Sequence, residues 1–261
     1  MTKKYKNIQD MILTRYAKNT RSLPWRQTTD PYQIMVSEIM LQQTQVERVI
    51  PKYLHFLELF PDIQSLAQAD KTKLLTVRSG LGYNSRALNL QKTAQAIVSQ
   101  HKNIFPQNKD ELIKLPGIGP YTAGAICAFA YNQDVTVIDI NIKRVLIHLL
   151  KLDPDVSPKD LEKIVADILP KWQSRTRYNA LMDYGAMVLT SRKTGIKSPS
   201  QSKFAWSARQ VRGNLIRHLT TFGPISVDDA KKKFHHVDFD QIVAKMVKEW
   251  TIQIQNNTIV L

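Results

Sequence analysis

Two acidic residues stand where the surrounding sequence is otherwise apolar, and acids in such surroundings can do chemistry. Glu38 lies in Ser37-Glu38-Ile39-Met40-Leu41, and Asp139 lies in Val137-Ile138-Asp139-Ile140. Burial raises the pKa of a carboxyl group and makes it a usable acid, whereas a carboxylate that stays ionised can stabilise a positive charge. Cleavage of a glycosidic bond needs one of each. The plainer alternatives are a solvent-facing Glu38 and an Asp139 that caps a helix, and the sequence alone does not bring the two together.

A glycine-rich turn offers a second kind of chemistry, the binding of phosphate. In Leu115-Pro116-Gly117-Ile118-Gly119-Pro120 an apolar helix end is followed by Gly-x-Gly and then by a new apolar helix. Glycines let backbone N–H groups approach a phosphate closely at the positive end of the second helix. Such a hairpin can hold a DNA backbone without reading bases, although a lone Gly-x-Gly can also be only a tight turn.

The overall charge agrees with a phosphate-bearing partner. The 261 residues include 37 Lys and Arg against 22 Asp and Glu, which gives a net charge of +15. A basic surface of this size favours nucleic acid. The single cysteine, Cys127, excludes an internal disulfide framework, and the histidines show no metal-ligand spacing, so we expect no metal site. No signal peptide and no stretch of ~18 apolar residues is present, so we expect a cytoplasmic, nucleoid-associated protein.

Helices must position these residues, because apolar side chains recur at helical spacing through most of the chain. We therefore predict an all-α body over residues 1–190. The segments with this spacing are Ile8 to Tyr16, Ile34 to Val46, Tyr53 to Phe60, Leu88 to Val98, Tyr121 to Tyr131, Ile142 to Leu150 and Leu161 to Met187.

A small second domain is expected after a polar linker. Residues 191–203 are rich in Ser, Lys, Gly and Pro, as linkers and surface loops are. In residues 204–261, three helical segments, the second opened by a capping box of Ser226 and Asp229, precede an alternating pattern around an Asn256-Asn257 turn. Three helices and a β-hairpin are the pattern of a winged helix. The alternative is a helical extension that only packs on the body.

The ordered motifs resemble those of helix-hairpin-helix DNA glycosylases, and most closely the MutY-type adenine glycosylases. The resemblance covers residues 5–190 and implies a two-lobed helical body of the HhH-GPD type, with the site in a cleft between the lobes. The segments that carry it are Leu23-Pro24-Trp25-Arg26, Asp30-Pro31-Tyr32, Ser37 to Val46, Gly80-Leu81-Gly82-Tyr83, Arg86-Ala87-Leu88-Asn89-Leu90, the hairpin, the Asp139 segment and Met182-Asp183-Tyr184-Gly185-Ala186-Met187.

The resemblance implies a role for each matching residue. Glu38 would protonate the departing adenine and Asp139 would stabilise the sugar cation, with Tyr121 and Asn141 supporting the site. The target base must leave the stack, and wedge residues fill the gap that it leaves. The remaining expected contacts are Trp25 and Arg26 in the base pocket; Gln42, Gln43 and Tyr83 at the gap or the opposing base; and Gly117, Gly119 and Lys143 on DNA. Arg209 and Arg212 lie beyond the resemblance and are expected on DNA only as part of residues 204–261. A structural K⁺ or Na⁺ held by hairpin carbonyls is a further option.

Two differences from relatives bear on the mechanism and on the cofactor. Bifunctional relatives of the endonuclease III type carry a nucleophilic lysine where this chain has Tyr121, so we expect a monofunctional enzyme that uses water. The family also places a [4Fe–4S] cluster on Cys-x6-Cys-x2-Cys-x5-Cys after the helical body. Aligned from Gly185-Ala186-Met187, those positions hold Leu189, Ile196, Pro199 and Ala205, so no cluster is expected. Lys193, Lys197 and Lys203 could instead let this loop hold phosphate.

The end of the chain weakens the substrate assignment. Residues from Lys203 onward are too few for the Nudix-like domain with which adenine glycosylases recognise 8-oxoguanine. We expect excision of adenine opposite guanine or 8-oxoguanine from double-stranded DNA, by a monomer. The alternatives are excision of thymine or uracil opposite guanine and a catalytically silent DNA-binding protein. If residues 204–261 bind DNA, Arg217 and Lys231-Lys232-Lys233 would join Arg209 and Arg212 in phosphate contact, and affinity would fall steeply with salt.

Overall fold

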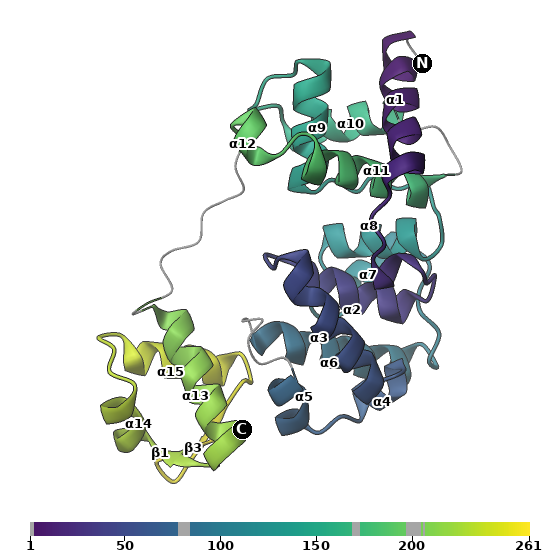
Figure 1. The fold of residues 1–261 in the computed structure, drawn as a ribbon. Helices are drawn as coiled ribbons and strands as arrows, with labels where there is room; N and C mark the ends of the chain where they lie inside the picture. Colours follow the sequence, from purple (N-terminus) through teal and green to yellow (C-terminus); the bar gives the residue numbers. More distant parts are fainter. Residues whose placement is uncertain (1–2, 78–83, 169–172, 197–204, 206) are drawn as a thin grey trace. The chain divides into compact units, whose positions relative to one another are not determined.

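The structure is a computed structural model that describes residues 3–77, 84–168, 173–196, 205 and 207–261 (Figure 1). It is mostly helical, as predicted. The chain divides into two compact units. The first comprises the described residues of Met1–Glu38, Pro106–Lys114 and Ile118–Ser200, and the second those of Ile39–Phe105, Leu115–Gly117 and Gln201–Leu261. The predicted ranges 1–190, 191–203 and 204–261 stay a prediction, because most of the linker lies outside the described residues.

The first unit is built around helix α11, which packs against α9, α1 and α8. Its core includes the fully buried Tyr178, whose hydroxyl donates to Val135 O at 2.6 Å and accepts from Val137 N at 3.1 Å. These bonds fix the irregular segment that leads to Asp139. The helices of this unit are α1 (Lys3–Asn19), η1 (Pro24–Arg26, a 3₁₀ helix), α7 (Lys109–Lys114), α8 (Pro120–Phe129), α9 (Ile140–Leu150), α10 (Pro158–Ile168), α11 (Ser174–Met187) and α12 (Ser191–Thr194).

Helix α2 (Pro31–Leu41) has most of its length in the first unit and its last turn in the second. The other helices of the second unit's N-terminal part are α3 (Val46–Leu59), α4 (Ile63–Ala67), α5 (Lys71–Val77) and α6 (Asn84–Gln100). Helix α6 packs on α4 and α5. Phe56, Phe60, Leu66 and Leu90 are among the side chains that form its core.

Three helices and a small sheet form the C-terminal part, as the winged-helix pattern predicts. They are α13 (Ala208–Phe222), β1 (Ile225–Ser226), α14 (Val227–Lys233), α15 (Phe239–Lys248), β2 (Gln253–Gln255) and β3 (Thr258–Val260). The sheet is antiparallel with the order β1-β3-β2. Ser226 caps α14 by accepting from Asp229 N, and Asn256 and Asn257 both have positive φ in the hairpin turn. The sequence did not predict β1, which is only two residues long.

Among the described residues, no helix combines the length and the apolar character that a membrane crossing would need.

Candidate active site

Glu38 is buried on α2, where its carboxyl group holds a proton more readily than it would in water. Only 7 % of the residue is exposed, and its neighbours Ser37 and Ile39 are buried as well. Burial raises the pKa of this carboxyl group to about 7, and the nearby charge of Asp139 adds to the increase. The Tyr121 hydroxyl and the more distant charge of Arg26 act in the opposite direction. Glu38 can therefore carry a proton near neutral pH, and the solvent-facing alternative is wrong.

Tyr121 stands in the first turn of α8, directly after the glycine turn, and hydrogen-bonds to Glu38. Burial and the two nearby carboxyl groups raise the pKa of its phenol well above the ordinary value. The phenol therefore stays neutral and can only orient Glu38. The glycine turn thus has a structural role, because it sets where α8 begins and where Tyr121 stands.

Asp139 is both a helix cap and a partner of Glu38. As the N-cap of α9, its Oδ1 accepts from Ile142 N at 2.7 Å, and its Oδ2 accepts from Asn141 Nδ2 at 2.8 Å. Burial raises the pKa of Asp139, while these two bonds and the charge of Arg144 favour the ionised form. Because the charge of Asp139 raises the pKa of Glu38, the pair holds one proton more easily than none. Donors surround Asp139, so the proton belongs on Glu38.

Asn141 is fixed in turn by Arg144 and by a close helix contact, neither of which the sequence predicted as part of the site. Arg144 is 4 % exposed, and its Nη1 donates to Asn141 Oδ1 at 3.0 Å and to Gly185 O at 3.4 Å. A Cβ atom added at Gly185 would lie 2.7 Å from Asn141 O. The glycine therefore lets α11 approach the start of α9 closely. The spacing of a lone Gly in an otherwise helical segment was the only sequence signal for this contact.

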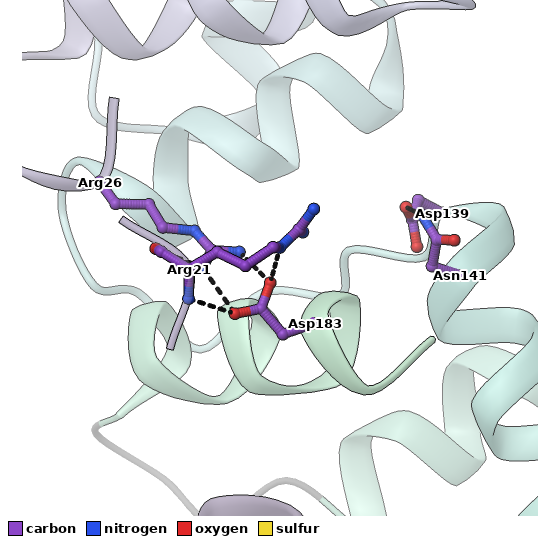
Figure 2. Close-up of polar contacts among 5 residues, drawn as sticks. All are labelled: Arg21, Arg26, Asp139, Asn141 and Asp183. Carbon is purple, nitrogen blue, oxygen red and sulfur yellow. Dashed lines mark hydrogen bonds and ion pairs between the residues drawn. The ribbon is translucent and has the colours of Figure 1, made fainter. Parts of the chain in front are cut away.

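Asp183 on α11 is the most densely bonded carboxylate described, and nothing in the sequence predicted a role for it. It accepts two bonds from the guanidinium of Arg26, at 2.7 and 2.8 Å, and from Arg21 through both Nε at 2.5 Å and the backbone N–H at 3.1 Å. Figure 2 shows both arginines converging on Asp183, with Asp139 and Asn141 beyond them at the start of α9. Burial alone would raise the pKa of Asp183, but the two arginines outweigh it and hold the pKa below its ordinary value. Trp25, beside Arg26 in η1, is 8 % exposed.

Two structural requirements shape the glycine turn. Gly117 has a φ of +79°, and a Cβ atom there would lie 2.6 Å from Asn89 Cβ, so the fold itself demands glycine. Thr93 on α6 donates to Pro116 O and holds the turn from the same side. Gly119 differs, because a Cβ atom there would meet nothing within 4 Å. Its lack of a side chain leaves the N-terminus of α8 open to a partner.

The other predicted DNA-contacting residues are dispersed. Gln42 is half-buried and Gln43 is exposed after the end of α2, while Lys143 is half-buried in the first turn of α9. Tyr83 lies outside the described residues. On α13, Arg209 is half-buried and Arg212 forms an ion pair with Glu249. A phosphate at Arg212 would have to compete with that carboxylate.

The residues available do not fit an iron–sulfur cluster. Of the four positions that would need cysteine, Leu189 is buried, Ile196 offers its carbonyl oxygen to Arg144 Nε at 3.2 Å, and Pro199 lies outside the described residues. The fourth is Ala205. The single cysteine, Cys127, is buried on α8 beside Gln107 O. Within the described parts of the chain, no three His, Cys, Asp or Glu side chains gather where they could hold a metal ion.

Comparisons with known proteins show which family and which structures the chain resembles. The family described as HhH-GPD superfamily base excision DNA repair protein matches residues 36–171. An adenine DNA glycosylase of Buchnera aphidicola is 42 % identical over 172 residues, which are 64 % of this chain and 48 % of that protein. One of Mycolicibacterium smegmatis is 35 % identical over 227 residues, 78 % of each chain. The structure of a thermostable thymine-DNA glycosylase matches with a TM-score of 0.67 and 27 % identity, covering 74 % of this chain and 90 % of that one. The match thus spans about half the length of the Buchnera relative.

Proposed function

This chain belongs to the HhH-GPD superfamily of base excision DNA repair proteins, and from that membership we propose that it is an adenine DNA glycosylase acting on adenine opposite guanine or 8-oxoguanine. The observation that carries the proposal is the pair of Glu38, whose pKa is raised to about 7, and Asp139, which accepts bonds from Asn141 and Ile142. The two relatives that are named adenine DNA glycosylases, at 42 % and 35 % identity, favour adenine over thymine.

In the proposed reaction Glu38 gives its proton to the adenine as the glycosidic bond breaks. The electron pair of that bond leaves with the base, and the sugar becomes a cation-like species beside the Asp139 carboxylate. Water then adds to the sugar carbon, and the proton it releases restores Glu38. Tyr121 keeps Glu38 in place, and no amine stands at that position to form a Schiff base. The product is free adenine and an abasic site.

The proposed partner is double-stranded DNA, with one phosphate held at the N-terminus of α8. The open space at Gly119 supports this, since a backbone N–H there can be approached closely. We propose that the enzyme works as a monomer and without an iron–sulfur cluster. A bound K⁺ or Na⁺ at the turn carbonyls is an optional addition to the same site.

Alkali-induced strand cleavage of four labelled duplexes tests the function. They contain A:G, A:8-oxoguanine, T:G and U:G pairs, and we expect cleavage of the first two. Glu38→Gln and Asp139→Asn should each lower the single-turnover rate by about 10²- to 10⁴-fold, since each removes one half of the acid and anion pair. Glu47→Gln, at an exposed position in the first turn of α3, is the matched control and should keep the full rate.

Each arm of this test has an outcome that contradicts the proposal. Cleavage of the T:G or U:G duplex in preference to A:G would replace adenine by a pyrimidine. Full activity in both carboxylate variants would mean that the site is elsewhere. Borohydride reduction during the reaction should trap little protein on DNA, whereas efficient trapping of the unmodified enzyme would overturn the monofunctional mechanism.

A further inference from the structure

The turn that follows α2 has a strained backbone at the position expected to enter the duplex. Gln43 has a φ of +58°, in the left-handed region that residues other than glycine rarely adopt. Such a conformation persists only where the surrounding structure enforces it. Thr44 contributes two local bonds, from its N–H to Leu41 O at 3.2 Å and from its hydroxyl to Gln42 O at 3.3 Å.

A side chain from a distant helix adds the main restraint. Arg86 stands in the first turn of α6, and its Nη1 donates to Ile39 O at 3.0 Å and to Gln42 O at 2.6 Å. Both acceptors are carbonyl groups at the C-terminal end of α2, where a helix leaves carbonyls unsatisfied and carries partial negative charge. One guanidinium nitrogen thus ends the helix and fixes the first residue after it.

We infer that Arg86 is a positioning residue that pre-forms the Gln42-Gln43 turn as a wedge for base flipping. This rests on the proposed function, because a wedge is needed only if a base leaves the stack. The Nη1 atom of Arg86 bonds two backbone carbonyls, and Arg86 is absent from the groups that shift the pKa of Glu38. Its loss should therefore weaken the extrusion of the base and leave the bond-breaking chemistry intact.

The physical reason is pre-organisation. A wedge held in its inserted shape loses little conformational freedom when it enters the duplex, whereas a turn free to leave the left-handed region must be ordered at each encounter. Misplacement of a positioning group by about 1 Å can change a rate by about 10²-fold. A merely structural arginine would instead lower stability and all activities together.

The experiment measures base extrusion separately from excision. A duplex with 2-aminopurine at the target position becomes more fluorescent when that base unstacks, whether or not it is excised. We expect Arg86→Met to reduce the fluorescence increase at saturating protein by about tenfold, which corresponds to ordering about one further backbone residue on insertion. Its affinity, measured by anisotropy of a labelled duplex, should match that of Arg15→Met, which removes one positive charge at an exposed position on α1. Arg86→Lys keeps the charge but ends one bond earlier, so it should resemble Arg86→Met.

Each remaining outcome decides the question. Equal fluorescence in Arg86→Met and Arg15→Met, or a loss explained wholly by weaker binding, overturns the inference. If Arg86→Met does not fold, Arg86→Lys carries the test, and unstacking like that of the unmodified protein then overturns it. Unmodified protein that binds without any fluorescence increase also overturns it. If the unmodified protein unstacks the base but releases no adenine from A:G duplexes, the adenine assignment fails while the inference about Arg86 is still decided by the variants.

Discussion

Asp183 and Glu38 are both buried in the first unit, but their pKa values are shifted in opposite directions. Around Asp183, two guanidinium groups and a backbone N–H supply four bonds, and the pKa lies below its ordinary value. Around Glu38, burial raises the pKa to about 7, and the hydrogen bond from the Tyr121 phenol offsets only part of that rise. Arg26 acts on both, but its bonds go to Asp183 and only its more distant charge reaches Glu38.

The difference shows that partners, more than burial, decide the charge of these groups. Burial disfavours ionisation of both side chains, and each is less than a tenth exposed. A carboxylate with matched cations is an anchor that fixes the residues around it, here Arg21 and Arg26. A buried carboxyl group without matched cations, such as Glu38, holds its proton to a higher pH and can act as a proton donor. The same chemical group thus anchors two arginines at Asp183 and can carry a proton at Glu38. The charge of Arg26 acts on both groups.

Removal of the Asp183 charge is the strongest way to test the anchor. Asp183→Asn leaves two guanidinium groups with too few acceptors, and breaking a buried pair in this way destabilises a protein by about 3–5 kcal/mol. We expect the free energy of unfolding in urea to fall by about that amount. Asp240→Asn, in the exposed pair with Lys231, is the matched control and should change it far less. A loss in Asp183→Asn no larger than in the control would show that the arginines are satisfied without Asp183.

Replacing the acid by its amide at Glu38 should raise the free energy of unfolding, whereas it lowers it at Asp183. In the folded protein the pKa is about 7 against an ordinary 4.5, so the native state holds a proton that the unfolded chain releases between these values. Stability contributed by the neutral carboxyl group is therefore present below pH 4.5 and is lost as the pH rises toward 7. At pH 8 Glu38→Gln should be more stable than the unmodified protein by up to about 3 kcal/mol. At pH 4.5 the two should be nearly equal.

Thermal and urea unfolding at the two pH values measure this difference. Glu47→Gln, whose side chain is exposed, should show no such pH-dependent gain and serves as the control. A Glu38→Gln protein that is less stable than the unmodified one at pH 8 would mean that Glu38 is ionised and paired in the fold, and the contrast with Asp183 would disappear.

The sequence singled out the two candidate carboxyl groups and the glycine turn, because these are local patterns. Glu38 and Asp139 each stand out as a charge in an apolar stretch, and Gly117 with Gly119 marks a turn between helices. Tyr121 was predicted to support the site only through the family resemblance. The C-terminal hairpin was likewise readable from alternation around Asn256-Asn257, since a two-residue turn fixes its own register.

The anchor and the supports were not readable, because they depend on long-range contacts between ordinary residue types. Arg21 and Asp183 are separated by 162 positions, and an arginine or aspartate on a helix is usually a solvated charge. Arg144 appeared only as one basic residue among many in a chain of net charge +15. Only the packing of α11 against α9 and α1 brings these side chains together. The pKa of Glu38 could not be predicted from the sequence either, since it is set by the groups that surround the side chain in space.

A third carboxyl group, Asp139, can be compared with Asp183 and Glu38 by changing only the packing around its partner Asn141. It lies between the two extremes, bonded by Asn141 but without a direct cation bond among those described, and Asn141 depends on the close approach at Gly185. Gly185→Ala forces the Cβ atom against the backbone of Asn141, so we expect a loss of about 2 kcal/mol in the free energy of unfolding and a slower excision rate. Gly213→Ala on α13, where a Cβ atom meets nothing, is the control and should be neutral or slightly stabilising. Equal effects of the two substitutions would mean that Asn141 is not held by this contact.

The dependence of the excision rate on pH is the smallest expected effect, and it compares the three carboxyl groups most directly. If Glu38 must be protonated, the single-turnover rate falls about tenfold for each pH unit above 7, the pKa that burial gives it. On the acid side the rate falls when Asp139 takes up a proton, and because burial raises the pKa of Asp139 this occurs above its ordinary 3.8. Asp183 contributes no limb near neutral pH, since its arginines keep it ionised. In Glu38→Gln the residual rate should lose the alkaline limb and keep the acid one. An alkaline limb that survives in Glu38→Gln belongs to another group, and Glu38 would then not be the acid.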